Sequence, residues 1–126
     1  MRLHPSLRIA WLNDSLPELS RVRAMRRHFD LVMLTAVWMH LDPKQRARAM
    51  PHVAALVRPG GVMILSLRHG PVPQGRRMFD VSATETERLA AADGLVLILR
   101  YDFLDGALRR PGISWSRLAF RKPCTG

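Results

Sequence analysis

The pattern of apolar and polar residues is clearest in the segment FDLVMLTAVWMHL, residues Phe29–Leu41. After Asp30, four apolar residues follow without a polar break, which is typical of a strand covered on both faces, as parallel strands are. The run ends in the small residues Thr35 and Ala36. Because ligands of open α/β sheets bind just beyond the carboxyl ends of strands, we expect a ligand site at Thr35–His40.

Two helices are predicted around this strand. The first is short, begins near Pro17 with Ser15 as its cap, and has apolar residues at every third position: Leu16, Leu19, Val22 and Met25. The second begins at Asp42, and Pro51 predicts a kink or break near Met50 because an interior proline lacks an amide donor. The stripe of the second helix that faces the sheet is predicted to comprise Ala47, Met50, Val53, Ala54 and Val57.

A capping box formed by Ser82 and Glu85 predicts a third helix, which ends at Gly94. Residues 1–6 are predicted to be a tail, and Arg58–Gly61 to stop the second helix in a tight reversal. Four more segments have the pattern of strands: Arg8–Asn13, Val62–Leu67, Leu95–Tyr101 and Ile113–Arg121.

Strands and helices alternate up to the last two strands, which predicts an α/β domain that ends in an antiparallel pair. A chain of 126 residues suits one domain, so residues 1–126 are expected to form a single unit. The connection Arg68–Asp80 is long for a compact domain, and loops of this length are usually functional or mobile. Residues Asp102–Gly112 are predicted to be a turn-rich connection.

Composition excludes several classes. No apolar stretch is long enough to span a membrane, and the N-terminal residues lack the apolar core of a signal peptide, so a soluble cytoplasmic protein is expected. Cys124 is the single cysteine, which allows no internal disulfide and leaves no partner for a metal site.

The net charge is +10, because eighteen arginines and two lysines outnumber ten acidic residues. Such a balance suits nucleic acid or other anionic partners, but the charges are scattered along the chain, as they are when arginine is the preferred surface cation. The densest cluster comprises Arg21, Arg23, Arg26, Arg27 and His28. No aromatic residues are interleaved with it, which disfavours stacking on bases. A nucleic-acid-binding module therefore remains a less favoured alternative.

Three motifs in order give the chain a family likeness: the acidic turn WLNDSLPEL, the strand FDLV running into TAVWMHL, and the helix-to-strand signature LVRPGGVMILS. Together they resemble the C-terminal two-thirds of a class I S-adenosylmethionine-dependent methyltransferase, over roughly Leu7 to Lys122. The resemblance implies a partial Rossmann-like sheet, mostly parallel with an antiparallel C-terminal strand pair, and helices on both faces. It also implies S-adenosylmethionine as the cofactor.

The resemblance assigns cofactor contacts by position. Asp14 would reach the adenine amino group, and the backbone amide of Ser15 or Leu16 a ring nitrogen. A helix-capping role for Asp14 is the alternative, and the two roles are compatible. Residues just past the strand would flank the bound cofactor, namely Thr35, Ala36 and Val37.

The same resemblance places Trp38 and His40 beneath a substrate cleft, and Ser66, Arg68 and His69 in a loop that touches substrate. For Trp38 the alternative is packing in the core, and for His40 it is a structural hydrogen bond. The ordinary pKa of histidine suits His40 to act as a general base if a partner orients the ring. The alternative for the loop is a solvated turn.

One part of the family pattern is missing. Such enzymes begin with a strand and a glycine-rich loop that approaches the methionine end of the cofactor, and this sequence has no such loop. Without the strands that normally lie beside it, FDLVML would present an apolar edge unless Arg8–Asn13 pairs with it or another chain completes the sheet. A protein partner or a homodimer is therefore expected at this edge. The chain alone is expected to bind S-adenosylmethionine weakly or not at all.

Besides the less favoured nucleic-acid-binding module, two functions from different classes remain. The first is methyl transfer, in which catalysis is mostly positioning. Methylases of exocyclic amines on nucleic acid carry an Asn or Asp, two prolines and an aromatic residue after the strand, whereas this chain has Thr35–Trp38, so a small-molecule acceptor is expected. The second is a non-catalytic methyltransferase-like remnant, or half of a split enzyme that acts through a partner.

Overall fold

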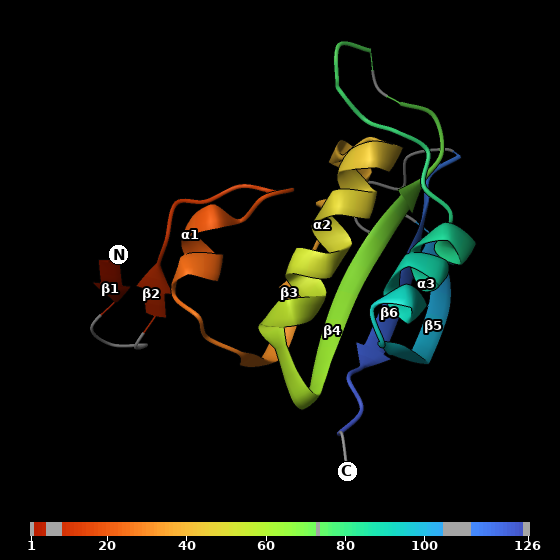
Figure 1. Cartoon of the computed structure of the whole chain (residues 1–126). Coiled ribbons are helices and arrows are strands. Elements are labelled where there is room, and N and C mark those ends of the chain that lie inside the picture. Colours follow the sequence, from red (N-terminus) through yellow and green to blue (C-terminus); the bar gives the residue numbers. More distant parts are fainter. Residues whose placement is uncertain (1, 5–8, 73, 105–111, 125–126) are drawn as a thin grey trace.

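A computed structural model describes residues 2–4, 9–72, 74–104 and 112–124 (Figure 1). Along the chain its elements are β1 (Arg2–His4), β2 (Ile9–Trp11), α1 (Ser20–Ala24), β3 (Phe29–Leu34), a 3₁₀ turn η1 (Trp38–His40), α2 (Pro43–Leu56), β4 (Val57–His69), α3 (Ala83–Ala92), β5 (Val96–Leu104) and β6 (Ser114–Arg121). Most of the connection predicted over residues 102–112 lies outside the described residues.

The main sheet has four strands in the order β3-β4-β6-β5. β3 pairs with β4 in parallel, and β6 runs antiparallel to both of its neighbours. Three strands therefore share one direction, and only β6 opposes them. This arrangement confirms the predicted α/β class, with a mostly parallel sheet and an antiparallel C-terminal pair.

The longer helices, α2 and α3, lie together on one side of this sheet (Figure 1), rather than one on each face. Side chains of β4 that point toward them are fully buried, namely Met63, Leu65 and Leu67. On the opposite face of β3, by contrast, Leu31 is 50% and Met33 58% exposed. The described residues thus form a sheet with one covered face and one open apolar face.

The helix α2 begins as predicted. Asp42 accepts a hydrogen bond from the Gln45 amide, and the Gln45 side chain accepts one from the Asp42 amide. The predicted break near Met50 is wrong, because the helix continues through Pro51 to Leu56. Of the predicted stripe, Met50, Val53, Ala54 and Val57 are buried as expected, and only Ala47 is wrong because it is exposed. Arg46, Ala49 and Leu56 are further buried residues of this helix.

The second helix ends at Leu56, just before Arg58–Gly61, in agreement with the predicted stop. The predicted third strand begins earlier than Val62, however, because β4 already starts at Val57 and includes these four residues. Two glycines make this start possible. Gly60 has a left-handed backbone with φ of +84°, and a Cβ on Gly61 would lie within 2.9–3.1 Å of three backbone oxygens. The Gly60 amide also donates to the Lys122 carbonyl, which joins the start of β4 to the end of β6.

The N-terminal segment differs most from prediction. Residues 2–4, expected in a tail, form β1 and pair with β2. The strand β2 therefore does not join the main sheet, and within the described residues no strand pairs with the free edge of β3. The predicted first helix is shorter than expected, because α1 spans only Ser20–Ala24 and follows Leu19 in a left-handed conformation.

Candidate functional site

The turn after β3 has the strained geometry that often marks a functional site. Thr35 and Ala36 are exposed at its tip, and Ala36 has a positive φ of 54° although it is not glycine. Val37 is half-buried and leads into η1. The chain thus turns sharply at the carboxyl end of a strand, where ligands of α/β sheets bind.

Trp38 lies inside the molecule. Its side chain is completely buried in the hydrophobic core, so it has no surface to offer a substrate in this arrangement, and packing is its role here. Within the described part of the chain, the buried indole Nε1–H has no hydrogen-bond acceptor.

His40 is exposed and held by a short strap, residues 77–79, from the loop after β4. The imidazole Nδ1 lies 3.2 Å from the Arg77 carbonyl, and Arg77 Nη1 donates to the His40 carbonyl at 2.9 Å. The Phe79 amide donates to the Met39 carbonyl at 2.9 Å. Because a carbonyl only accepts, Nδ1 carries the proton and the lone pair of Nε2 is free. The strap therefore supplies the orienting partner that a general base needs.

Arg77 is itself fixed on α2. Its Nη2 donates to Gln45 Oε1 at 3.1 Å and lies 3.5 Å from Asp42 Oδ2, and its guanidinium stacks over the ring of Phe79. The N-terminus of α2, the turn η1 and the strap are thus one connected unit.

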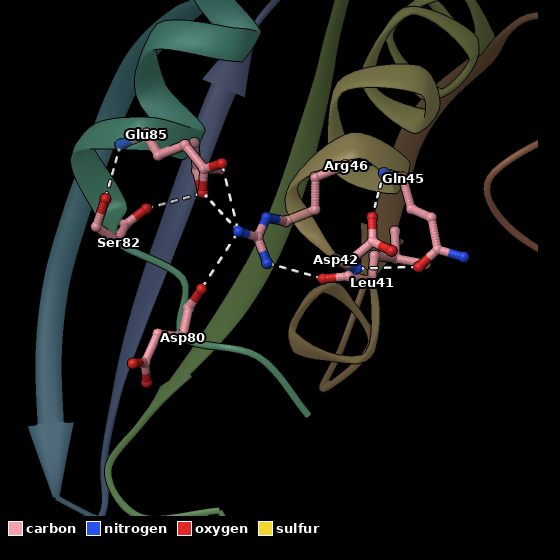
Figure 2. Close-up of polar contacts among 8 residues, drawn as sticks. Leu41, Asp42, Gln45, Arg46, Asp80, Ser82 and Glu85 are labelled. Atoms are coloured by element: carbon pink, nitrogen blue, oxygen red, sulfur yellow. Dashed lines mark hydrogen bonds and ion pairs between the residues drawn. The ribbon is translucent and has the colours of Figure 1, made fainter. Parts of the chain in front are cut away.

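A buried arginine joins this unit to α3 (Figure 2). Arg46 is 2% exposed and donates to the Leu41 carbonyl at 2.8 Å and to the Asp80 carbonyl at 3.2 Å. Its Nη2 also lies 3.1 Å from a carboxylate oxygen of Glu85. The Ser82 hydroxyl accepts the Glu85 amide and caps α3, as predicted. The structure gives no second hydrogen bond of the predicted capping box between these two residues, and the Glu85 carboxylate engages Arg46 instead.

The end of β4 carries the other predicted substrate contacts. Ser66 and Arg68 are buried, and Arg68 Nη2 donates to the Pro71 carbonyl at 2.8 Å. His69 Nε2 lies 2.7 Å from Ser116 Oγ, which donates to Asp102. Arg68 and His69 line a cavity of about 400 Å³, together with Gly70, Asp80, Val81, Ser82, Ala83, Thr84 and Arg100.

Asp14 is used locally as a cap. Its two carboxylate oxygens accept the Val22 amide of α1 at 2.8 Å and the Ser15 amide at 2.9 Å. The hydrogen bond from Val22 is the largest cause that holds the pKa of Asp14 below its ordinary value. The cap predicted at Ser15 is thus supplied by its neighbour. Leu16 is half-buried and packs against the core.

The basic cluster near α1 surrounds a second cavity, of about 350 Å³, lined by Arg23, Arg26, Arg27, His28, His52, Ala55 and Leu56. Burial, followed by Arg23 and Arg48, lowers the pKa of His52. Glu18 lies 3.8 Å from the ring and acts in the opposite sense, but burial and the two cations outweigh it. This cavity lies between α1 and the C-terminal end of α2, beside the N-terminal end of β3.

The structure therefore places the predicted residues in separate regions. Thr35–His40 meets the strap, while Arg68 and His69 line the cavity beside α3. Sequence reasoning missed Arg46, Arg77 and Ser116, because charged and hydroxyl residues at such positions are usually solvated. For Arg46 a signal was present, since it lies three residues before Ala49 and four before Met50 on the apolar stripe.

Among the residues that the structure describes, no group of His, Cys, Asp and Glu side chains has the geometry of a metal site. In the same residues no helix has both the length and the apolar character needed to cross a membrane.

No family model matches the chain, and no curated protein matches it in sequence. Solved structures do share its fold. A 1,6-didemethyltoxoflavin-N1-methyltransferase of Burkholderia thailandensis, with S-adenosylhomocysteine bound, aligns with a TM-score of 0.61 at 17% identity, over 76% of this chain and 44% of that one. The N-methyltransferase NodS of Bradyrhizobium japonicum aligns with a TM-score of 0.60 at 17% identity, over 77% and 52%. The [4+2]-cyclase SpnF aligns with a TM-score of 0.60 at 13% identity, over 79% of this chain and 52% of that one.

The chain therefore has the Rossmann-like fold of S-adenosylmethionine-dependent methyltransferases, and the predicted resemblance is confirmed at the level of fold. It spans about half the length of these neighbours. At 13–17% identity the likeness shows the fold alone, and one neighbour is described as a cyclase. What the chain does must be argued from its site.

Proposed function

We propose that this chain forms part of an S-adenosylmethionine-dependent methyltransferase for a small-molecule acceptor. The observation that carries the proposal is the turn after β3, where a strained Ala36 and an oriented His40 stand at the carboxyl end of a strand in a methyltransferase fold. A structural neighbour of this fold holds S-adenosylhomocysteine.

The residues present suit the adenosine half of the cofactor. Each carboxylate oxygen of Asp14 accepts one backbone amide and keeps a second lone pair, so an adenine amino group can still be bound. The amides of Ser15 or Leu16 would meet a ring nitrogen, and Thr35, Ala36 and Val37 would flank the nucleoside. When bound, the cofactor supplies a methyl group on an electrophilic sulfonium.

His40 is the proposed general base. With its proton fixed on Nδ1, the free Nε2 would take the proton of an acceptor hydroxyl or amine placed against η1. Arg68 and His69 would contact the remainder of the acceptor from the end of β4. Trp38 contributes by packing beneath the turn.

A nuclear magnetic resonance titration of the chain with S-adenosylhomocysteine tests this proposal, because it detects weak binding. Saturable shifts are expected at the amides of Ser15, Thr35 and Ala36, with a dissociation constant weaker than micromolar. Adenosine should give the same pattern and guanosine should not. Asp14→Ala should abolish the shifts, whereas Asp93→Asn, at the far end of α3, should keep them. No saturable shift at any of these amides would overturn the proposal.

A second function is favoured by the free edge of β3. Leu31 and Met33 are half-exposed beside this edge, and the chain spans about half the length of its neighbours. We propose that the occupant is the complementary set of strands of a methyltransferase-type sheet, carried on another stretch of polypeptide. The chain would then act as one half of a split domain, catalytic or not.

Light scattering of the chain alone, and of chains with Leu31→Glu plus Met33→Glu, tests the second function. We expect the chain to be a monomer that captures a fragment carrying the glycine-rich half of a methyltransferase. The double variant should fail to capture this fragment. A stable dimer that the double variant dissociates would identify a second copy as the occupant and overturn the split-domain reading. A matched double variant at exposed positions of α3 outside the cavity beside that helix, Arg88→Glu plus Ala91→Glu, should change neither outcome.

A further inference from the structure

In the described part of the chain, the face of the main sheet opposite α2 and α3 is apolar across all four strands (Figure 1). Residues that stand in register on neighbouring strands share a face, and two rows of them cross this open face from β3 to β5. The first row is Leu31, Val62, Arg121 and Val96, and the second is Met33, Ile64, Ala119 and Leu99.

The exposure of these rows does not suit the sheet that carries them. β3 and β4 run parallel, and parallel strands occur almost only in sheets whose two faces are both covered by helices. On the open face, however, Met33 is 58% and Val96 52% exposed. Contiguous apolar patches of this kind mark interaction sites. A helix is therefore the element that this face is shaped to receive.

Cations stand inside the open face rather than around its rim. Arg117 and Arg121 belong to β6, an inner strand, and their register with β4 places both side chains on this face. Arg121 is exposed and has no hydrogen bond or ion pair to any described residue. The guanidinium of Arg117 stacks over the rings of Tyr101 and Phe103 on β5. Both arginines keep donors for an outside carboxylate.

The two acidic residues of the sheet do not balance these cations. Asp102 accepts a hydrogen bond from Ser116 on the face that the helices cover, and Asp30 pairs with Arg58 at the start of β4. The open face thus has positive charge on an apolar background, in a chain of net charge +10. A second copy of the chain would bring arginines against arginines, so electrostatics opposes that occupant.

A lipid surface fits the pattern less well than a helix does. Charged groups are costly in the hydrocarbon of a bilayer, so a face that inserts there needs its cations at the rim, level with the headgroups. Here Arg117 and Arg121 lie between the strands β4 and β5, with apolar side chains on either side. An amphipathic helix can bring carboxylates to such positions, because acidic side chains flank its apolar stripe.

We propose that the open face binds an amphipathic helix whose apolar stripe is flanked by acidic side chains that pair with Arg117 and Arg121. These arginines are four residues apart on β6, or about 13 Å, which about nine residues of an α-helix span. Such a helix would supply the second covering layer of the sheet. The inference goes beyond the pairing proposed for the edge of β3, because it concerns the face and does not require that edge to be filled.

A synthetic amphipathic helix of about six turns is the probe. It has leucines along one stripe, glutamates beside them, and a hydrocarbon staple on its far side that keeps it helical. One matched peptide has lysine in place of every glutamate, and another has the same composition in scrambled order. Fluorescence anisotropy of labelled peptides, titrated with the full chain, should show saturable binding of the glutamate peptide, at least about tenfold tighter than that of the lysine peptide. Equal affinities for all three peptides would overturn the proposal.

Variants locate the binding surface. Arg121→Glu should weaken binding of the glutamate peptide and tighten that of the lysine peptide, a reversal that loss of the fold cannot produce. Val96→Glu plus Leu99→Glu, on the side of the face away from β3, should abolish saturable binding of the glutamate peptide. Arg88→Glu makes the same charge change at an exposed position of α3 and should alter affinity by less than about twofold. Unchanged affinity in folded Arg121→Glu would contradict the assignment.

Two other results would identify a different occupant and overturn the helix. One is a dimer of the chain, seen by light scattering, that Val96→Glu plus Leu99→Glu dissociates. The other is sedimentation of the chain with vesicles of phosphatidylserine and phosphatidylcholine while the glutamate peptide does not bind. Absence of nucleoside binding would instead remove methyl transfer and keep this surface, because the peptide titration makes no use of the turn after β3.

Discussion

The guanidinium of Arg46 and the carboxylate of Glu85 meet 3.1 Å apart between α2 and α3. Through the same guanidinium, the carbonyls of Leu41 and Asp80 are also satisfied, so one side chain closes the loop after β4 onto the turn after β3. Both candidate binding regions depend on that closure, because the strap reaches η1 from this loop and the cavity is bounded by its end.

Arg46→Met is expected to lower the free energy of unfolding by about 3 kcal/mol, because it leaves two carbonyls and a half-buried carboxylate without their donor. Arg48→Met is the matched control on the same helix. Arg48 is 62% exposed in its ion pair with Glu18, so its loss should cost less than about 1 kcal/mol. Urea unfolding followed by circular dichroism measures both. Equal losses in the two variants would show that burial of Arg46 adds nothing.

Trp38→Phe is expected to change stability by less than about 1 kcal/mol. The smaller ring loses packing, but the variant also removes a buried N–H that has no acceptor among the described residues. Trp38→Ala, by contrast, should cost about 3–5 kcal/mol because it empties a fully buried site. If the two variants cost the same, the indole N–H has a partner that stabilises it.

Lowering the pH is expected to destabilise α1, because the Asp14 carboxylate that accepts the Val22 amide becomes protonated. Its pKa in the folded chain is lowered from 3.8, first by the Val22 amide, so its contribution to stability is present above pH 3.8 and is lost as the pH falls through the lowered value. Hydrogen exchange of the Val22 amide should therefore accelerate, relative to intrinsic exchange, below about pH 4. Asp14→Asn should flatten this dependence. A pH dependence that survives in Asp14→Asn would assign it to another acid.

Gly61→Ala is expected to destabilise the chain by about 2–3 kcal/mol, because the new methyl meets three backbone oxygens that cannot move independently. Gly75→Ala is the control for backbone strain alone. It has φ of +79° with nothing within 4 Å of a built Cβ, so a cost of about 1 kcal/mol is expected. Exchange of the Lys122 amide, which donates to the Gly61 carbonyl, reports the local effect. Normal protection of that amide in Gly61→Ala would contradict the crowding.

The parts of the fold that short-range chemistry decides were predictable. Ser82 with Glu85, and Asp42 at the start of α2, are caps whose partners lie three residues away, so the sequence contains the whole interaction. The continuation of α2 through Pro51 was not predictable in this way, since packing of Met50 and Val53 against the sheet decides it. The pairing of β1 with β2 was not predictable either, because it depends on which strands lie close together in the folded chain.

In the candidate site, too, the features set by local sequence were predictable, whereas contacts between distant segments were not. The position of Thr35–His40 directly after a strand follows from the apolar pattern, and the structure places it there. The expectation that this strand is covered on both faces is wrong for the described residues, because Leu31 and Met33 of β3 are exposed on the open face of the sheet. The partner of His40 does not follow from it, because Arg77 lies 37 residues further along the chain and meets the ring only after the loop has folded back. Arg46 escaped prediction for a related reason, since its acceptors come from three separate segments.

The contact between His40 and the strap has a consequence for the order of events. In the neutral ring, the Arg77 carbonyl selects the tautomer with the proton on Nδ1 and leaves the lone pair on Nε2. Without that contact the ring would exchange between its two neutral tautomers and would be free to rotate. In the methyl transfer proposed above, His40 would therefore be oriented as a base only while residues 77–79 contact η1, so the long loop after β4 and the turn after β3 would have to come together before an acceptor could lose its proton.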